Sequence, residues 1–216
     1  MSLSIHLALP LLVASFSILI AVTTNGATDP LHLALKHLQR GVTLERRQAA
    51  KQLGQIGNQL AVQPLARALH DADQLVREIA EQSLWQIWLR SGQTNVDTRL
   101  SEGILAMQRG ALQLAVEIFS DVIEMAPDFA EAYNKRATAY YLLQEYEKSI
   151  RDCDSTIILN PVHFGALSGA GLNYLGLHNP LKALEFFERA VAVNPNMPQI
   201  QQYIKAIKDF LRDETL

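Results

Sequence analysis

Apolar residues recur every three or four positions along most of the chain after residue 30, which is the spacing of amphipathic helices. In the carboxy-terminal half this pattern itself repeats, because Ala126–Pro127, Asn160–Pro161 and Asn194–Pro195 are 34 residues apart. Each proline follows an apolar-periodic segment and cannot continue a helix. Residues 93–197 are therefore predicted to form three helical hairpins, at about 96–129, 130–163 and 164–197. A capping helix and tail, residues 198–216, would cover the last open face.

The three hairpins share small and aromatic residues at matching positions. The third has Leu167, Ala170, Gly171, Tyr174, Ala183, Phe187, Ala190 and Pro195. The second has Tyr133, Ala137, Tyr140, Ser149, Cys153, Thr156 and Pro161, and the first keeps Gly103, Ala115, Phe119 and Pro127. This set resembles tetratricopeptide repeats (TPRs). The first hairpin departs from them at Arg99 and Glu102, and the second at Arg136, where small or apolar residues are usual.

The resemblance extends to a group of small exported bacterial TPR proteins. It is carried by PDFAEAYNKRATAYYLL and PVHFGALSGAGL and runs from about Trp85 to the carboxy terminus. It implies an α-solenoid fold and a binding type of function, with no particular chemistry attached.

A second period, of 31 residues, governs the region before Trp85. It superposes Leu38, Arg46, Ala49, Leu53 and Ile56 on Leu69, Arg77, Ala80, Leu84 and Ile87. Asp71 and Asp73 stand where they can cap a helix, and Asp71 followed by Arg77 resembles the Asp–Arg ladder of HEAT repeats. Residues 28–92 are therefore predicted to be two HEAT-like repeats. Trp85 and Trp88 share a helix face and are expected to join the two arrays, with residues 91–97 as a polar bend in one continuous, all-α solenoid.

The segment NPVHFGALSGAGLNYLG, residues 160–176, reads as a helix although it contains four glycines, each of which costs a helix about 1 kcal/mol relative to alanine. The repeat pattern explains Gly171, where a neighbouring helix should cross, and Gly176, where the helix should end. It does not explain Gly165 or Gly169.

The TPR resemblance implies that the first helices of successive hairpins line a concave groove. The residues expected to line it are Leu100, Ile104, Met107, Asn134, Thr138, Tyr141, Leu142, Gly165, Ser168, Leu172 and Leu175. Such an apolar groove would take an apolar side chain or an amphipathic helix of a protein or peptide partner. The alternative is that these residues pack against the terminal helix or a second copy of the chain. A clamp for a carboxylate is not expected, because the matching positions lack Lys and Arg.

The sequence gives no sign of a catalytic centre, metal site or cofactor. None of the six histidines is paired at helical spacing with another. Cys153 occupies a packing position and is expected to be a small buried hydrophobe. Asp152 and Asp154 are expected to be solvated or capping carboxylates. An alternative function follows from the HEAT-like pair, because short HEAT-like repeats also occur in enzymes that attach bilins to phycobiliproteins.

Composition and the amino terminus bear on partners and location. A net charge of −3 gives no bias toward polyanions, so nucleic acid is not an expected partner. Residues 1–27 have an apolar run followed by small polar residues, which predicts a cleaved export signal and a periplasmic or secreted protein. The alternative is a membrane anchor at residues 7–22, favoured by the cations that follow the run.

Overall fold

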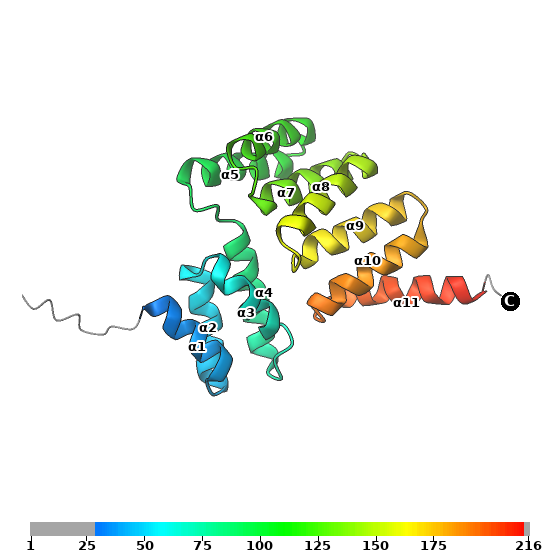
Figure 1. The fold of residues 1–216 in the computed structure, drawn as a ribbon. Coiled ribbons are helices and arrows are strands. Elements are labelled where there is room, and N and C mark those ends of the chain that lie inside the picture. Colours follow the sequence, from blue (N-terminus) through cyan, green and yellow to red (C-terminus); the bar gives the residue numbers. More distant parts are fainter. Residues whose placement is uncertain (1–28, 214–216) are drawn as a thin grey trace, which may run out of the picture.

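The computed structural model describes residues 29–213, and all regular structure within them is helical (Figure 1). The amino-terminal unit comprises four helices: α1 (Pro30–Arg40), α2 (Thr43–Ile56), α3 (Gln59–Ala68) and α4 (Gln74–Trp88). The carboxy-terminal unit comprises seven: α5 (Thr94–Gln108), α6 (Leu112–Met125), α7 (Ala130–Leu142), α8 (Tyr146–Leu159), α9 (Phe164–Gly176), α10 (Pro180–Val193) and α11 (Pro198–Asp213). The predicted all-helical class is confirmed.

The repeated prolines end helices as predicted. Helices α6, α8 and α10 stop one or two residues before Pro127, Pro161 and Pro195 respectively. The glycine-rich segment also forms the predicted helix, α9, because its apolar residues are buried in the array. Tertiary packing thus outweighs the low helix propensity of glycine.

Small residues in the first helix of each hairpin face large ones in the second. A Cβ on Gly171 would lie 2.5 Å from the Phe187 ring, and a Cβ on Gly103 equally close to Phe119. The middle hairpin has Ala137 and Cys153 at the same two positions, in one buried cluster. The glycines of the outer hairpins are therefore small because a phenylalanine occupies the space, as predicted for Gly171.

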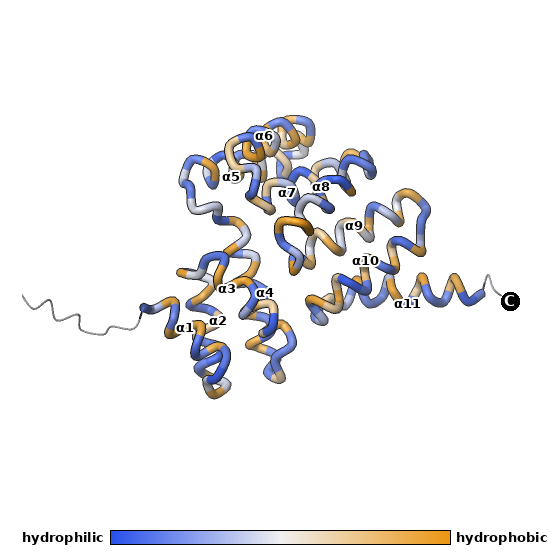
Figure 2. Tube along the Cα trace, in the orientation of Figure 1, coloured by the Kyte–Doolittle hydropathy of each residue, from blue (hydrophilic) through white to orange (hydrophobic). Residues whose placement is uncertain are grey.

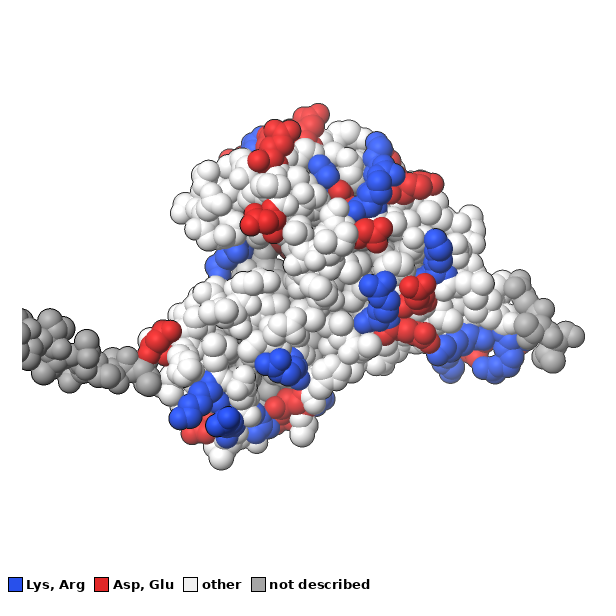
Figure 3. Space-filling view, viewed as in Figure 1, with Lys and Arg blue, Asp and Glu red and all other residues white. Residues whose placement is uncertain are grey.

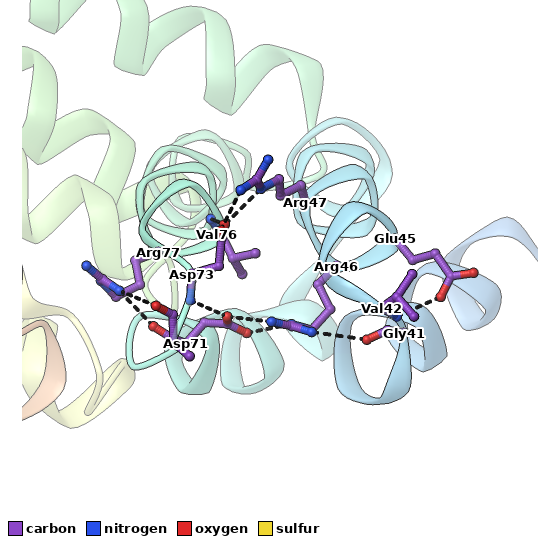
Figure 4. Close-up of polar contacts among 10 residues, drawn as sticks. Gly41, Val42, Glu45, Arg46, Arg47, Asp71, Asp73, Val76 and Arg77 are labelled. Atoms are coloured by element: carbon purple, nitrogen blue, oxygen red, sulfur yellow. Dashed lines mark hydrogen bonds and ion pairs between the residues drawn. The ribbon is translucent and has the colours of Figure 1, made fainter.

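Ion pairs join the two hairpins of the amino-terminal unit (Figure 4). Arg46 binds Asp71 through two hydrogen bonds of 2.7 and 2.8 Å, and Arg47 pairs with Asp73. Asp73 also caps α4 by accepting from the Val76 amide, as predicted. Asp71 does not cap the helix directly but accepts from the Asp73 amide. We call this set of contacts the ladder.

The expected end-to-end stack of the two units is not present. Helix α4 packs on α2 and α3 rather than forming a layer against α5. The chain reverses after α4, and the amino-terminal unit lies alongside the turns that connect one hairpin of the carboxy-terminal unit to the next (Figure 1). Its buried cluster includes Phe164, with Val162, Val193 and Met197 packed around it. Trp85 and Trp88 do join the two units, but at the third hairpin of the second unit rather than the first.

The polar open face of the first TPR-like hairpin explains this arrangement. Arg99 on α5 pairs with Glu102 on the same helix and with Asp121 on α6, and all three side chains are substantially exposed. An apolar helix stacked there would bury these charges, which is costly. The departures at Arg99 and Glu102 were thus a sign that nothing stacks on this face.

The ladder ends on a residue of the other unit. Arg77, one 31-residue period after Arg46, donates to the Asn196 side chain at 2.9 Å. Asn196 in turn donates to the Leu69 carbonyl oxygen, and its amide binds Asn194 Oδ1 just as the Asp73 amide binds Asp71 Oδ1. The turn between α10 and α11 therefore takes the place of the next ladder turn.

The predicted export signal, residues 1–27, and the alternative anchor, residues 7–22, lie outside the described residues. Within residues 29–213, no helix is both long and apolar enough to cross a membrane. Apolar and polar positions alternate around these helices (Figure 2).

Candidate functional site

The predicted groove residues fall into three groups in the structure. Leu100 does not belong to the groove: it is 1% exposed and lies in the core between α5 and α6. Ile104 and Met107 are half-buried against that same core. Because hairpin packing takes up these three side chains, α5 contributes less to a groove than predicted.

A second group lies where the amino-terminal unit meets α7 and α9. Gly165 lies beneath Trp85, since a Cβ at this position would be 2.5 Å from Cη2 of the indole. Asn134 is buried and donates to Glu131, and Ser168 is buried and donates to the Gly165 carbonyl oxygen. Gly165 is therefore small to admit the chain's own tryptophan, which corrects its assignment to an open groove. Gly169 has only ordinary contact with Cys153.

The third group stays accessible. Thr138 is exposed and Leu142 is 50% exposed at the end of α7, and Tyr141 is half-buried against Tyr146. Phe210 on α11, two 34-residue periods after Leu142, is 51% exposed. Leu172 and Leu175 lie between them in sequence, half-buried against the cluster around Phe187 and Ile200. Accessible apolar surface thus concentrates at the last turns of α7 and α11.

A buried polar network ties α7 to the start of α9. Glu131 and His163 have side chains that are 0% exposed, and His163 Nε2 lies 2.9 Å from Glu131 Oε2. His163 Nδ1 accepts from the Ala166 amide, so we assign the ring proton to Nε2, which donates to Glu131. His163 thus caps α9, as its predicted place at the turn allows. Trp88 stacks on its ring, with centroids 4.2 Å apart.

Electrostatics keeps Glu131 charged in this network. Burial alone would raise the pKa of its carboxyl, but the hydrogen bond from His163 and the charge of Lys135, 2.9 Å away, hold the pKa below its ordinary value. Lys135 also lies over the Trp85 ring, 5.8 Å from its centroid. The network therefore links α7, α9 and α4.

Both cations near the predicted groove are already paired. Lys135 binds Glu131, and Arg136 binds Asp152 through two hydrogen bonds of 2.8 Å. Arg136 also donates to Ser120. Asp152 is buried, so its expected role as a solvated or capping carboxylate is wrong: it neutralises Arg136 inside the array. Neither cation is free to hold a carboxylate ligand.

The remaining chemistry predicted from sequence can be placed directly. Cys153 is buried, as predicted, and burial raises the pKa of its thiol to about 12, so it is not a thiolate at neutral pH. Among residues 29–213, no three His, Cys, Asp or Glu side chains are grouped to hold a metal ion.

A cleft of about 750 Å³ separates the two units beside the linker. Its walls include Arg90, Asp97, Asp128, Phe129 and Leu159. Figure 3 shows the molecule hollowed between the lobe of α5 and α6 and the lobe of α1–α4, with acidic and basic side chains mixed over the visible face. The two units are thus in contact at the third TPR-like hairpin but apart near the first.

Similar proteins support the fold. No family model matches the chain. A TPR repeat-containing protein of Rhizobium etli is 27% identical over 124 residues, which cover 57% of this chain and 61% of that protein. The small glutamine-rich tetratricopeptide repeat-containing protein 2 of Saccharomyces cerevisiae is 24% identical over 178 residues, 80% of this chain and 51% of that protein. The chain thus spans less than two thirds of the length of either relative.

Among solved structures, the first TPR of Spaghetti (RPAP3), bound to the HSP90 peptide SRMEEVD, has a TM-score of 0.53 and 20% identity. It covers 54% of this chain and 93% of that chain. The chain therefore resembles TPR proteins in sequence and in fold.

Proposed function

We propose that the chain is a non-enzymatic scaffold that binds a protein partner through the concave side of its TPR-like helices and works in the cell envelope. One observation carries the binding role: Leu142 and Phe210 are each about half exposed at equivalent positions of α7 and α11. Apolar side chains at matching positions of successive repeats suit an amphipathic helix laid across them. The place in the envelope rests on the residue pattern of 1–27.

The chemistry of the face favours an apolar partner over an acidic tail. The structural neighbour is bound to SRMEEVD, a peptide with a net negative charge. In this chain Lys135 and Arg136 are engaged by Glu131 and Asp152, so they cannot pair with such a peptide without breaking existing ion pairs. Removing one partner from a buried pair is costly. We therefore infer that binding depends on apolar contact.

Site-specific photo-crosslinking in the native host tests this function. A photoreactive amino acid at Leu142 should capture a defined partner protein, identified by mass spectrometry. The control position is Ile158, which is 80% exposed on α8. Capture of the same proteins at both positions, or of none at Leu142, would refute the proposed binding face.

Export is tested separately by sequencing the amino terminus of protein purified from its host. A cleaved signal predicts a start near Thr28, whereas an intact Met1 on a membrane-bound form would support the anchor at residues 7–22.

A further inference from the structure

We propose that α4 is an internal ligand of the carboxy-terminal unit and holds, against a partner helix, the seat that the first turns of α7 and α9 form. The partner helix that fits the seat is amphipathic and carries an indole at the place of Trp85. This inference rests on the proposed function, because it describes how access to the same concave side is controlled.

The seat is built for an indole. Gly165 leaves room for Trp85, whose ring also meets His163 and Phe164 edge-on at centroid distances of 5.6 and 5.3 Å. Lys135 covers the same ring from α7. An aromatic side chain held between a glycine, two rings and a cation is the anchor arrangement of protein interfaces. Here the anchor comes from the same chain.

The remaining contacts between the units are polar and lie near solvent. Arg77 donates to Asn196, Asn196 donates to the Leu69 carbonyl oxygen, and an exposed His70 has Nε2 3.1 Å from the Val193 carbonyl oxygen. Water can replace hydrogen bonds of this kind at a small net cost. The aromatic seat is therefore the contact that decides whether the units stay together.

The linker allows the amino-terminal unit to leave the seat. Between α4 and α5, Gly92 has φ +85°, and a side chain there would meet nothing within 4 Å. The cleft of about 750 Å³ lies next to this glycine, so the units are not packed together at the linker end. Rotation about the linker would open the seat without disturbing α5–α11.

The seat overlaps the face that the repeat pattern assigns to a partner. Asn134, Gly165 and Ser168 are predicted groove residues, and all three lie in the first turns of α7 or α9. Gly165 is directly covered by Trp85. A partner helix can use these turns only when α4 is absent, so docking of α4 leaves only the last turns accessible.

A peptide with the sequence of residues 74–90 serves as the stand-in partner helix. Labelled with fluorescein, it should bind a full-length chain carrying Trp85→Ala and Arg77→Ala, because both changes lie on α4 and leave the seat intact. By fluorescence anisotropy its affinity for this variant should exceed that for the unaltered chain by about tenfold or more. A peptide that itself carries Trp85→Ala should not bind. Equal binding to both chains, or binding to neither while circular dichroism shows a folded variant, would overturn the proposal.

A second pair of variants covers the case in which the double variant does not fold. Gly165→Ala places a Cβ against Trp85, whereas Gly169→Ala on the same helix meets only Cys153 Sγ at 3.5 Å. Trp85 and Trp88 are the chain's two tryptophans, and both lie at the seat. Gly165→Ala should shift tryptophan emission to longer wavelength and make it more quenchable by acrylamide, and Gly169→Ala should not. Identical emission from both would contradict the internal-ligand proposal, whereas a failed crosslink at Leu142 would contradict only the proposed function.

Discussion

The amino-terminal and carboxy-terminal units both join one helical hairpin to the next, but with different chemistry. In α1–α4 the joints are ladder ion pairs, and Arg47 and Asp73 keep 35% and 20% of their side-chain surface exposed. In α5–α11 the hairpins are packed glycine against phenylalanine, and the central ion pair, Glu131 with His163, is fully buried. The amino-terminal unit is also incomplete, since Arg77 and its apolar core end on residues of the other unit. The comparison indicates that one unit depends on the other for folding.

Separating the units should give the largest effect. A fragment of residues 29–92 should be largely unfolded by far-ultraviolet circular dichroism, because it lacks Phe164, Val193, Met197 and Asn196. A fragment of residues 93–216 should keep its helices and melt cooperatively. Two hairpins alone bury too little apolar surface to be stable. Cooperative melting of the smaller fragment would show that the units are independent.

Removing the buried carboxylate should come next. Glu131→Ala leaves His163 and Lys135 without their partner, and the loss of one member of a buried ion pair costs about 3–5 kcal/mol. Urea denaturation measures this change in unfolding free energy. Glu117→Ala, at an exposed position of α6, is the control and should change stability by about 0.5 kcal/mol or less. Similar midpoints for the two variants would mean that Glu131 contributes nothing to the array.

Two leucines of the predicted groove should respond differently to charge. Leu172→Glu should lower unfolding free energy by roughly 1–3 kcal/mol, because the residue is half-buried against the cluster of α10 and α11. Leu142→Glu should change it by about 0.5 kcal/mol or less, because that side chain is half exposed. Thermal melts of both variants provide the measurement. A tolerant Leu172 would return this residue to the open groove.

Acid should weaken the ladder by a small amount. The hydrogen bond from Arg47 is the main cause that lowers the pKa of Asp73 from 3.8 to about 2. A carboxyl with a lowered pKa stabilises the fold above pH 3.8, and this contribution is lost as the pH falls from 3.8 toward 2. The melting temperature of the full chain should therefore fall over that range. An Arg47→Gln variant should show a smaller fall, and an equal fall in both would remove Asp73 as the cause.

Local rules explain what the sequence could predict. Proline spacing gave the hairpin boundaries, and the repeat pattern explained why Gly171 faces a large side chain. The groove prediction was less accurate, because it assigned residues by position within a repeat. Leu100 follows the same position as Asn134 and Ser168, yet it packs into the core of the first hairpin.

The seat could not be predicted because it joins residues distant in sequence. Trp85 and Gly165 belong to different repeat families, so neither period relates them. Two signals were present: a glycine that the repeat pattern left unexplained, and a charged face on the first hairpin at Arg99 and Glu102. Together they indicate a contact elsewhere, but only the three-dimensional arrangement identifies it.

The contact between Arg77 and Asn196 joins residues 119 positions apart, which sets an order of events during synthesis. The amino-terminal unit leaves the ribosome first, while Phe164 and Asn196, which complete its core and its ladder, are made much later. Long-range contacts form slowly because they must close a large loop. Until the last hairpin emerges, Trp85 and Trp88 have no seat and expose apolar surface that other nascent chains or chaperones can bind.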